Sequence, residues 1–336
     1  MSDGTRNGQP GRPGPPFPTP LIELLPAPGN VYAPVVRPVD RPRYGRALLF
    51  LALTFFTTTT LGPVMYVWSR GVSTPFGPYL SPHLVADVWG HPAMLAIGLA
   101  FSIPALLILL AHEMGHYVAC RIYGISCTPP YFLPSPFTFG TFGAFIRIKT
   151  PIYSKRQLFD VGIAGPIAGF VALVPFLLYG VAKSRPAPVT GSGAILYPGH
   201  CLAIELASRL FHGPLGKGMM LNLHPTALAA WLGLFATSLN LLPLGQLDGG
   251  HILYAALGRL QRRLALPLWL ALGLLGFYWP GWLLWCVVVL AIGLYHPPVY
   301  DESIPLDRGR RALAWMALLL FALCFMPVPI QEIGLG

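Results

Sequence analysis

The sequence predicts an all-α polytopic membrane protein. Of its 336 residues, 54% are hydrophobic and only 10% are charged, and the mean hydropathy is +0.60. A soluble domain carries about 25% charged residues, so this composition leaves too few charges to cover a water-facing surface. Apolar runs flanked by basic residues occupy most of the chain. We therefore expect about six to seven transmembrane or re-entrant helices and a small membrane-embedded β-like loop.

The chain is basic, with a formal net charge of +10. Its basic residues stand in short groups beside the apolar runs, as membrane orientation requires, so we expect a lipid bilayer as partner and no nucleic acid. The five cysteines are scattered and form no C-x-x-C pair. This spacing argues against a disulfide framework and against a thiolate zinc site.

The first 45 residues differ in composition from the rest. Residues 1–45 are rich in proline and glycine, which predicts a disordered arm. The arginines that end this arm precede an apolar run at 47–68, which is long enough to cross a bilayer about 30 Å thick. Their position before the first span places the N-terminus in the cytoplasm, and we expect the inner membrane of a bacterium. Residues 46–336 then form the membrane domain.

Four further membrane-spanning helices are expected, near residues 92–122, 158–181, 225–245 and 312–326. We interpret the segment 69–92 as a polar loop. A short amphipathic helix is expected near 201–211. In the 158–181 span, the sequence GIAGPIAGF places Gly165 and Gly169 on one face, where small residues let helices approach closely.

The C-terminal helices, 264–328, begin with an apolar stretch at 265–295 that is too long for one ordinary span. Pro280 and Gly281 interrupt its middle. Basic groups flank the stretch on both sides, and if both groups are cytoplasmic the chain must enter the membrane and return. We therefore expect a helical hairpin, with a single span as the alternative.

The segment 127–149 has a different pattern, rich in Pro, Phe, Gly and Thr, and it ends in TFGTFGAFIRIK. The alternation predicts short β-structure, and the prolines exclude a straight helix. Such a loop can lie at membrane depth only where protein or water covers its backbone.

His112-Glu113-Met114-Gly115-His116 is an H-E-x-x-H motif inside the 92–122 run. Positions four apart share a helix face, so both imidazoles can bind one Zn²⁺ with Glu113 beside the reacting water. Zinc lowers the pKa of such a water toward about 7, and a carboxylate can take its proton. A central charge inside a span costs about 2.5 kcal/mol or more, which favours a metal site over a polar helix end without metal.

Two histidines leave a catalytic zinc one protein ligand short. Asp248 follows the 225–245 span at a depth similar to that of His112, counted at about 1.5 Å per residue. Pro243 and nearby glycines loosen the chain there, so this carboxylate could turn toward the metal; the alternative is an interfacial turn aspartate. We interpret His251 as a hydrogen-bonded histidine, because an open catalytic site needs a water position more than a fourth protein ligand.

The HEMGH sequence and the later N-L-L-P-L-G-Q-L-D-G sequence resemble the paired motifs of the site-2 protease family of intramembrane metalloproteases. That family's second motif is N-x-x-P-x-x-x-x-D-G, and it is matched position by position by Asn240, Pro243, Asp248 and Gly249. The segments PPYFLP and LNLLPLGQLDGG are most similar to the branch of plastid gravitropism-related proteases and their bacterial relatives. The resemblance covers residues 90–260, the expected protease core.

The resemblance implies one Zn²⁺ per chain, held by His112, His116 and Asp248. It implies that Glu113 is the general base and that Asn240 helps to hold the substrate carbonyl or its oxyanion. The activity it implies is regulated intramembrane proteolysis, the hydrolysis of peptide bonds in membrane-spanning substrate proteins. The alternatives are a transmembrane metal transporter, which needs no general base, and a catalytically silent scaffold.

A protease must hold its substrate extended, because a helical substrate keeps its carbonyls in its own hydrogen bonds. An exposed strand edge can supply replacement bonds. The alternating segment after HEMGH is the candidate, and its proposed substrate-binding residues are Phe139, Gly140, Thr141, Phe142 and Gly143. The alternative is a structural loop that only fills the space between spans.

Overall fold

The structure is a computed structural model that describes residues 21–27, 31–37, 44–70, 80–137, 139–188 and 194–334. The chain divides into two units, Met1–Pro42 and Arg43–Gly336. In the first unit, strands β1 (Leu21–Ala27) and β2 (Val31–Arg37) pair antiparallel. They lie within the predicted disordered arm, whose remaining residues up to 43 are outside the described part of the chain.

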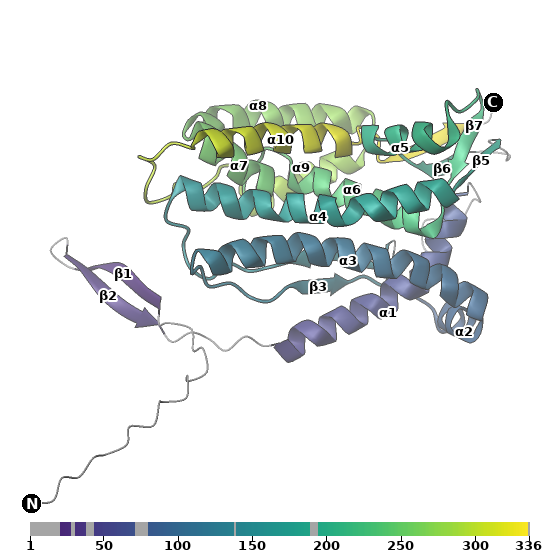
Figure 1. The fold of residues 1–336 in the computed structure, drawn as a ribbon, viewed down its shortest axis with the longest axis horizontal. Helices are drawn as coiled ribbons and strands as arrows, with labels where there is room; N and C mark the ends of the chain where they lie inside the picture. Colours follow the sequence, from purple (N-terminus) through teal and green to yellow (C-terminus); the bar gives the residue numbers. More distant parts are fainter. Residues whose placement is uncertain are drawn as a thin grey trace, which may run out of the picture. The chain divides into compact units, whose positions relative to one another are not determined.

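The second unit is mostly helical, as predicted. Three helices are long and apolar enough to cross a membrane: α1 (Tyr44–Trp68), α3 (Pro92–Ile122) and α4 (Lys155–Lys183). Helices α3 and α4 run side by side along this unit (Figure 1). The total of six to seven transmembrane or re-entrant helices stays a prediction.

The segment between the first two spans contains a helix where the sequence analysis expected only a loop. Helix α2 covers Pro82–Gly90. Its N-cap is Ser81, whose side chain accepts a hydrogen bond from the Leu84 amide at 3.1 Å. A capping serine followed by proline is a helix-start signal, so the prediction was wrong although the signal stood in the sequence.

The remaining helices are shorter. They are α5 (Leu202–His212), α6 (Pro225–Asn240), α7 (Asp248–Leu257), α8 (Leu260–Leu274), the 3₁₀ turn η1 (Leu275–Phe277), α9 (Gly281–Ile292) and α10 (Arg308–Cys324). Helix α5 confirms the expected amphipathic helix. Helices α8 and α9 form the expected hairpin: the Trp269 indole N–H donates to the Cys286 carbonyl at 3.0 Å, each about one turn and a half from the connecting bend.

The β-like loop is a hairpin of two antiparallel strands, β3 (Tyr131–Pro134) and β4 (Thr141–Phe145). A bridge between Cys127 and Ile148 extends the pairing. Two more strand pairs were not expected: β5 (Arg185–Pro188) with β7 (Met219–Asn222), and β6 (Ala194–Pro198) with β8 (Ile330–Gly334).

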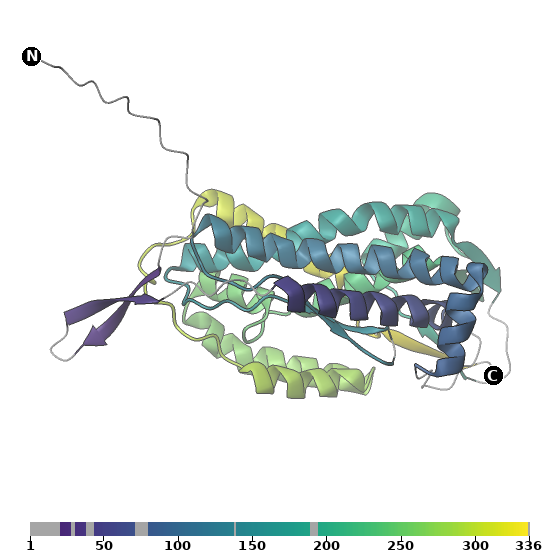
Figure 2. The same cartoon turned by 90° about the horizontal axis from the view of Figure 1, so that it is seen from below.

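The largest hydrophobic cluster lies where α1, α3, α4 and α6 meet, a region also visible from below (Figure 2). Its centre holds Trp231, Phe101 and Leu173, all fully buried. Burying such large side chains fixes the spacing of these helices. Of the polar residues singled out in the sequence, these helices carry His112, Glu113 and His116 on α3 and Asn240 on α6.

Candidate metal centre

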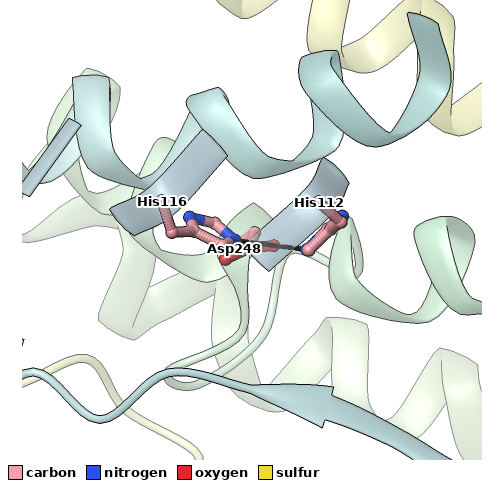
Figure 3. A group of neighbouring side chains, drawn as sticks. All are labelled: His112, His116 and Asp248. Carbon is pink, nitrogen blue, oxygen red and sulfur yellow. Dashed lines mark hydrogen bonds and ion pairs between the residues drawn. The ribbon is translucent and has the colours of Figure 1, made fainter. Parts of the chain in front are cut away.

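The H-E-x-x-H residues lie in the C-terminal half of α3. His112, Glu113 and His116 are all buried on α3. The two histidines are four residues apart, so their rings project from the same face of the helix. The Asp248 side chain comes from α7 and meets both rings (Figure 3).

The three side chains offer one ligand atom each at mutual distances that fit a metal ion. Asp248 Oδ2 lies 3.2 Å from His112 Nε2 and 3.3 Å from His116 Nε2. The two Nε2 atoms are 3.2 Å apart. A tetrahedral zinc with bonds of about 2.0–2.1 Å separates neighbouring ligand atoms by about 3.3–3.4 Å. These residues therefore fit the Zn²⁺ ion that the motif implies.

A backbone carbonyl of α4 orients one of the rings. His116 Nδ1 lies 2.7 Å from the Val161 carbonyl oxygen, which can only accept a hydrogen bond. Nδ1 therefore carries the proton, and the lone pair of Nε2 faces Asp248. This kind of contact commonly fixes the orientation of a metal-binding histidine.

The two predicted packing glycines lie where α4 passes these histidines. A Cβ atom on Gly165 would overlap the His116 ring, and one on Gly169 would lie 3.0 Å from Cβ of His112. In the opposite direction, a Cβ on Gly115 of α3 would overlap the Ala164 carbonyl. Small residues on both helices thus allow α3 and α4 to approach closely, so that the two histidines of α3 contact the backbone of α4.

The third candidate ligand is positioned by a turn rather than by a long helix. Helix α6 ends at Asn240, and Asp248 is the first residue of α7. We call the intervening residues 241–247 the Asp248 turn. After it, a Cβ on Gly249 would overlap the Leu241 carbonyl. The chain therefore folds tightly back on itself, which only glycine permits at that position.

Two other predicted site residues lie beside these ligands. The Asn240 side-chain nitrogen is 3.2 Å from His112 Nε2. Glu113 is 6% exposed, and its carboxylate faces the Ile146 backbone amide, just after β4. The structure thus brings the base candidate, the amide and the end of the strand to one place.

The Ile146 contact also shows which edge of β4 faces the site. Arg147 pairs with Thr128 on the β3 side, its carbonyl accepting from the Thr128 amide at 3.0 Å. Successive residues of a strand direct their backbone groups to opposite edges. The amides of Ala144 and Ile146 therefore face away from β3, and Ile146 reaches Glu113.

The five predicted substrate-binding residues are placed in two groups. Phe139 packs against Trp231, and the Gly140 carbonyl accepts a hydrogen bond from Thr57 of α1 at 2.6 Å. Thr141 is buried, with its hydroxyl bonded to the Leu133 carbonyl at 3.0 Å. These three residues anchor the hairpin.

The other two residues of that set are open to a ligand. Phe142 is 64% exposed, and a Cβ on Gly143 would contact nothing within 4 Å. The Ile146 amide and the Val161 carbonyl were not predicted, because a motif of side chains carries no signal for backbone groups. The Thr57 anchor was not predicted either, although the run of four threonines at 57–60 inside an apolar span is unusual.

Comparison with known proteins gives a consistent picture. A rice (Oryza sativa subsp. indica) protein described as probable zinc metalloprotease EGY2, chloroplastic, is 32% identical over 269 residues, which cover 75% of this chain and 46% of the relative. The Arabidopsis thaliana protein described as probable zinc metalloprotease EGY1, chloroplastic, is 29% identical over 260 residues, 72% of this chain and 45% of the relative. The chain thus spans about half the length of these relatives. No solved structure matches it.

These relatives are chloroplast proteins of plants, so they give no support to the bacterial inner membrane expected from the sequence. The Zn²⁺ ion and the membrane setting agree with their descriptions and with the apolar helices. The model of peptidase family M50 matches residues 100–268, about half of the chain, and these residues include the HEMGH helix and the Asp248 turn. This chain belongs to peptidase family M50.

Proposed function

We propose that the chain is an intramembrane zinc metalloendopeptidase that hydrolyses peptide bonds of membrane-spanning proteins. One observation carries this proposal above all: Glu113 lies on α3 between His112 and His116, whose ligand atoms meet Asp248. A site that only stores or passes a metal needs ligands, but it needs no carboxylate base beside them. The M50 membership supports the same activity.

The metal ion, Glu113 and Asn240 would each have a separate role in the reaction. Zn²⁺, when bound, supplies a Lewis acid that polarises a carbonyl and lowers the pKa of water. Glu113 takes the proton from the attacking water and later passes it to the leaving amine. The Asn240 amide, beside His112 Nε2, donates a hydrogen bond to the oxyanion that develops on the substrate carbonyl.

We infer that the substrate adds as a strand to the free edge of β4. The Ala144 amide faces that edge, and the next amide in the same direction, Ile146, already reaches Glu113. A substrate strand paired with Ala144 would therefore bring its backbone toward the base. Phe142 and Gly143 offer an exposed ring and an open approach at the start of the same edge.

The orientation in the membrane is also a proposal. The basic segments near residues 40, 155, 262 and 308 lie on the cytoplasmic side or on its equivalent in an organelle, following the distribution of basic residues. Cysteine labelling in oriented vesicles tests it. Labelling of residues 262 and 308 from opposite sides would contradict the arrangement.

The first experiment separates metal binding from proteolysis. Glu113→Gln is expected to keep its zinc and to lose cleavage of a single-span substrate in detergent by a factor of about 10²–10⁴, because an amide cannot accept the proton. Asp248→Ala is expected to lose both zinc and cleavage. Zinc content is measured by elemental analysis, and cleavage by gel electrophoresis with and without a chelator.

Two outcomes would count against the proposal. Substantial cleavage by Glu113→Gln, with contaminating proteases excluded, would remove Glu113 from its role. Unchanged metal flux into vesicles with that variant, together with no cleavage by the wild type, would favour a transporter.

The second experiment tests the strand edge. Ala144→Pro deletes an amide that faces the free edge beside the site, so cleavage of a membrane substrate should fall at least about ten-fold with zinc content unchanged. Ala144→Gly is the matched control, since it alters the same side chain and keeps the amide. Equal cleavage by the two variants would exclude pairing at this position.

A further inference from the structure

The last residue of α9 and the segment that follows it contact the Asp248 turn at several points. We call residues 292–297 the connector. The Gln246 side-chain amide donates to the Ile292 carbonyl at 2.8 Å, and the Gly245 backbone amide donates to the Leu294 carbonyl at 3.2 Å. The turn that precedes the third ligand is therefore held from outside by hydrogen bonds to another part of the chain.

A histidine pair makes the third contact. His296 Nε2, on the connector, lies 2.8 Å from His251 Nδ1, one helical turn after Asp248 on α7. His296 Nδ1 lies 2.5 Å from the Pro297 carbonyl, which can only accept, so Nδ1 carries the proton. In the neutral ring Nε2 is then the acceptor, and His251 donates from Nδ1. The hydrogen bond between the two rings therefore runs from His251 to His296.

Both rings of this pair pack against other elements of the fold. His296 is 3% exposed and stacks on Tyr254, with ring centroids 4.4 Å apart. His251 lies against α4, where a Cβ on Gly162 would come within 2.9 Å of its Cβ. Gly162 follows Val161, whose carbonyl orients His116. The pair therefore links the connector to the part of α4 that also supports a ligand.

We propose that His296 is a positioning residue for Asp248, acting through His251. The Asp248 turn has an irregular backbone, and the hydrogen bonds inside it are local ones, from Leu244 to Leu242 and from Leu247 to Leu244. The connector restrains the turn from three directions. His296 lies beyond residues 100–268, the part matched by the family model. The proposal rests on the zinc site described above.

The test measures metal binding by the full-length protein in detergent, without any substrate. His296→Leu removes the acceptor for His251 and is expected to weaken zinc binding about ten-fold in competition with a chelator. The visible absorption of the Co²⁺-substituted protein should change, because the ligand geometry is altered. His296→Gln keeps an acceptor oxygen near the Nε2 position and should restore most of the affinity and the spectrum.

A control uses another histidine that bonds to a backbone carbonyl, the half-buried His212. His212 Nε2 bonds to the Val181 carbonyl at 2.8 Å, about 30 Å along α4 from Val161. His212→Leu should leave zinc affinity and the Co²⁺ spectrum unchanged. An equal loss of affinity in His212→Leu and His296→Leu would overturn the proposal, because the effect would then be general destabilisation.

A milder variant covers the case in which His296→Leu does not fold. Gln246 is exposed, so Gln246→Ala removes one connector contact without opening the core, and a smaller weakening of zinc binding is expected. Wild-type affinity and spectrum in every foldable variant would overturn the positioning role. If these variants weaken zinc binding but the wild type cleaves no substrate, only the proposed proteolysis fails.

Discussion

Helices α3 and α4 and the hairpin α8–α9 are both apolar helix pairs, yet they are packed differently. Between α3 and α4, a single added Cβ on Gly115 or Gly165 would overlap the neighbouring helix or its histidine. In the hairpin, a Cβ on Gly273 would meet Cys286 Sγ at an ordinary 3.8 Å, and one on Gly276 would meet only the end of the flexible Leu283 side chain, at 2.6 Å. Between α3 and α4 the close contacts are instead with a backbone carbonyl and with the ring of a candidate ligand.

The outer face of the α8–α9 hairpin is exposed and does not pack against another helix of the described chain. Leu270, Leu274, Leu284 and Val287 are more than half exposed, while Leu272 and Trp282 are buried inside. In a membrane protein such a face meets lipid, which is as apolar as leucine and imposes no precise fit. The comparison teaches that hydrophobicity alone keeps a helix in the bilayer, whereas small residues set the distances that chemistry needs.

The largest effect is expected from an added methyl group in the tighter pair. Gly165→Ala should displace the His116 ring, and zinc affinity and cleavage should fall about 100-fold. Gly273→Ala, the same change in α8, should leave both unchanged and stabilise its helix by up to about 1 kcal/mol. Zinc affinity is measured by competition with a chelator, and cleavage is measured with a membrane substrate. If Gly165→Ala and Gly273→Ala reduced zinc affinity equally, the proposed difference in packing between the two helix pairs would be wrong.

A smaller effect, a loss of stability, is expected when the ion pair at the ends of α3 and α4 is removed. Arg310 of α10 donates from Nε to Asp160 Oδ1 of α4 at 2.8 Å, and the Asp160 carboxylate also accepts from Tyr123 just after α3. The pair is about three-quarters buried, with side-chain exposures of 24% and 22%. Arg310→Met should therefore cost about 2 kcal/mol, less than a fully buried pair.

The control for this prediction is the neighbouring residue. Arg311 is exposed, so Arg311→Met should change the thermal midpoint in detergent very little. If both variants lost stability equally, the ends of α3 and α4 would be held by general charge and not by this ion pair.

The smallest effect concerns the charge at the start of α10. Asp307 caps the helix, accepting from the Arg310 amide at 3.0 Å, and this bond together with Arg310 lowers the pKa of its carboxyl. A lowered pKa contributes stability above the unfolded pKa, and this contribution is lost as pH falls below about 4. Asp307→Asn keeps a capping side chain and removes the charge.

The wild type and Asp307→Asn should therefore differ slightly in thermal midpoint at pH 6, and the two midpoints should converge as the pH approaches 3. A difference that grew at low pH would contradict the assigned direction of the pKa shift. Because the group is fully exposed, this change should leave the α3–α4 contact and the zinc affinity untouched.

Much of the fold followed from the pattern of apolar residues. The long helices α1, α3 and α4 match the predicted runs closely, because a span of fixed length must satisfy its own backbone. Helix α6 ends at Asn240, before the predicted boundary at 245, because the chain turns to deliver Asp248. The pairs β5–β7 and β6–β8 were missed, since their partners are distant in sequence and carry no alternating pattern.

The sequence by itself determined the ligand types and their spacing. His112 and His116 share a helix face by the geometry of any α-helix, and the motif with Asp248 suggested the third ligand. Only the tertiary structure decided what holds them: the Val161 carbonyl, the Ile146 amide and the connector with His296. Backbone groups look alike in every sequence, and contacts between distant segments depend on how the helices pack. The periodicity of the sequence therefore predicts which side chains lie on the same side of a helix. Only the folded structure decides which backbone groups and distant side chains contact them.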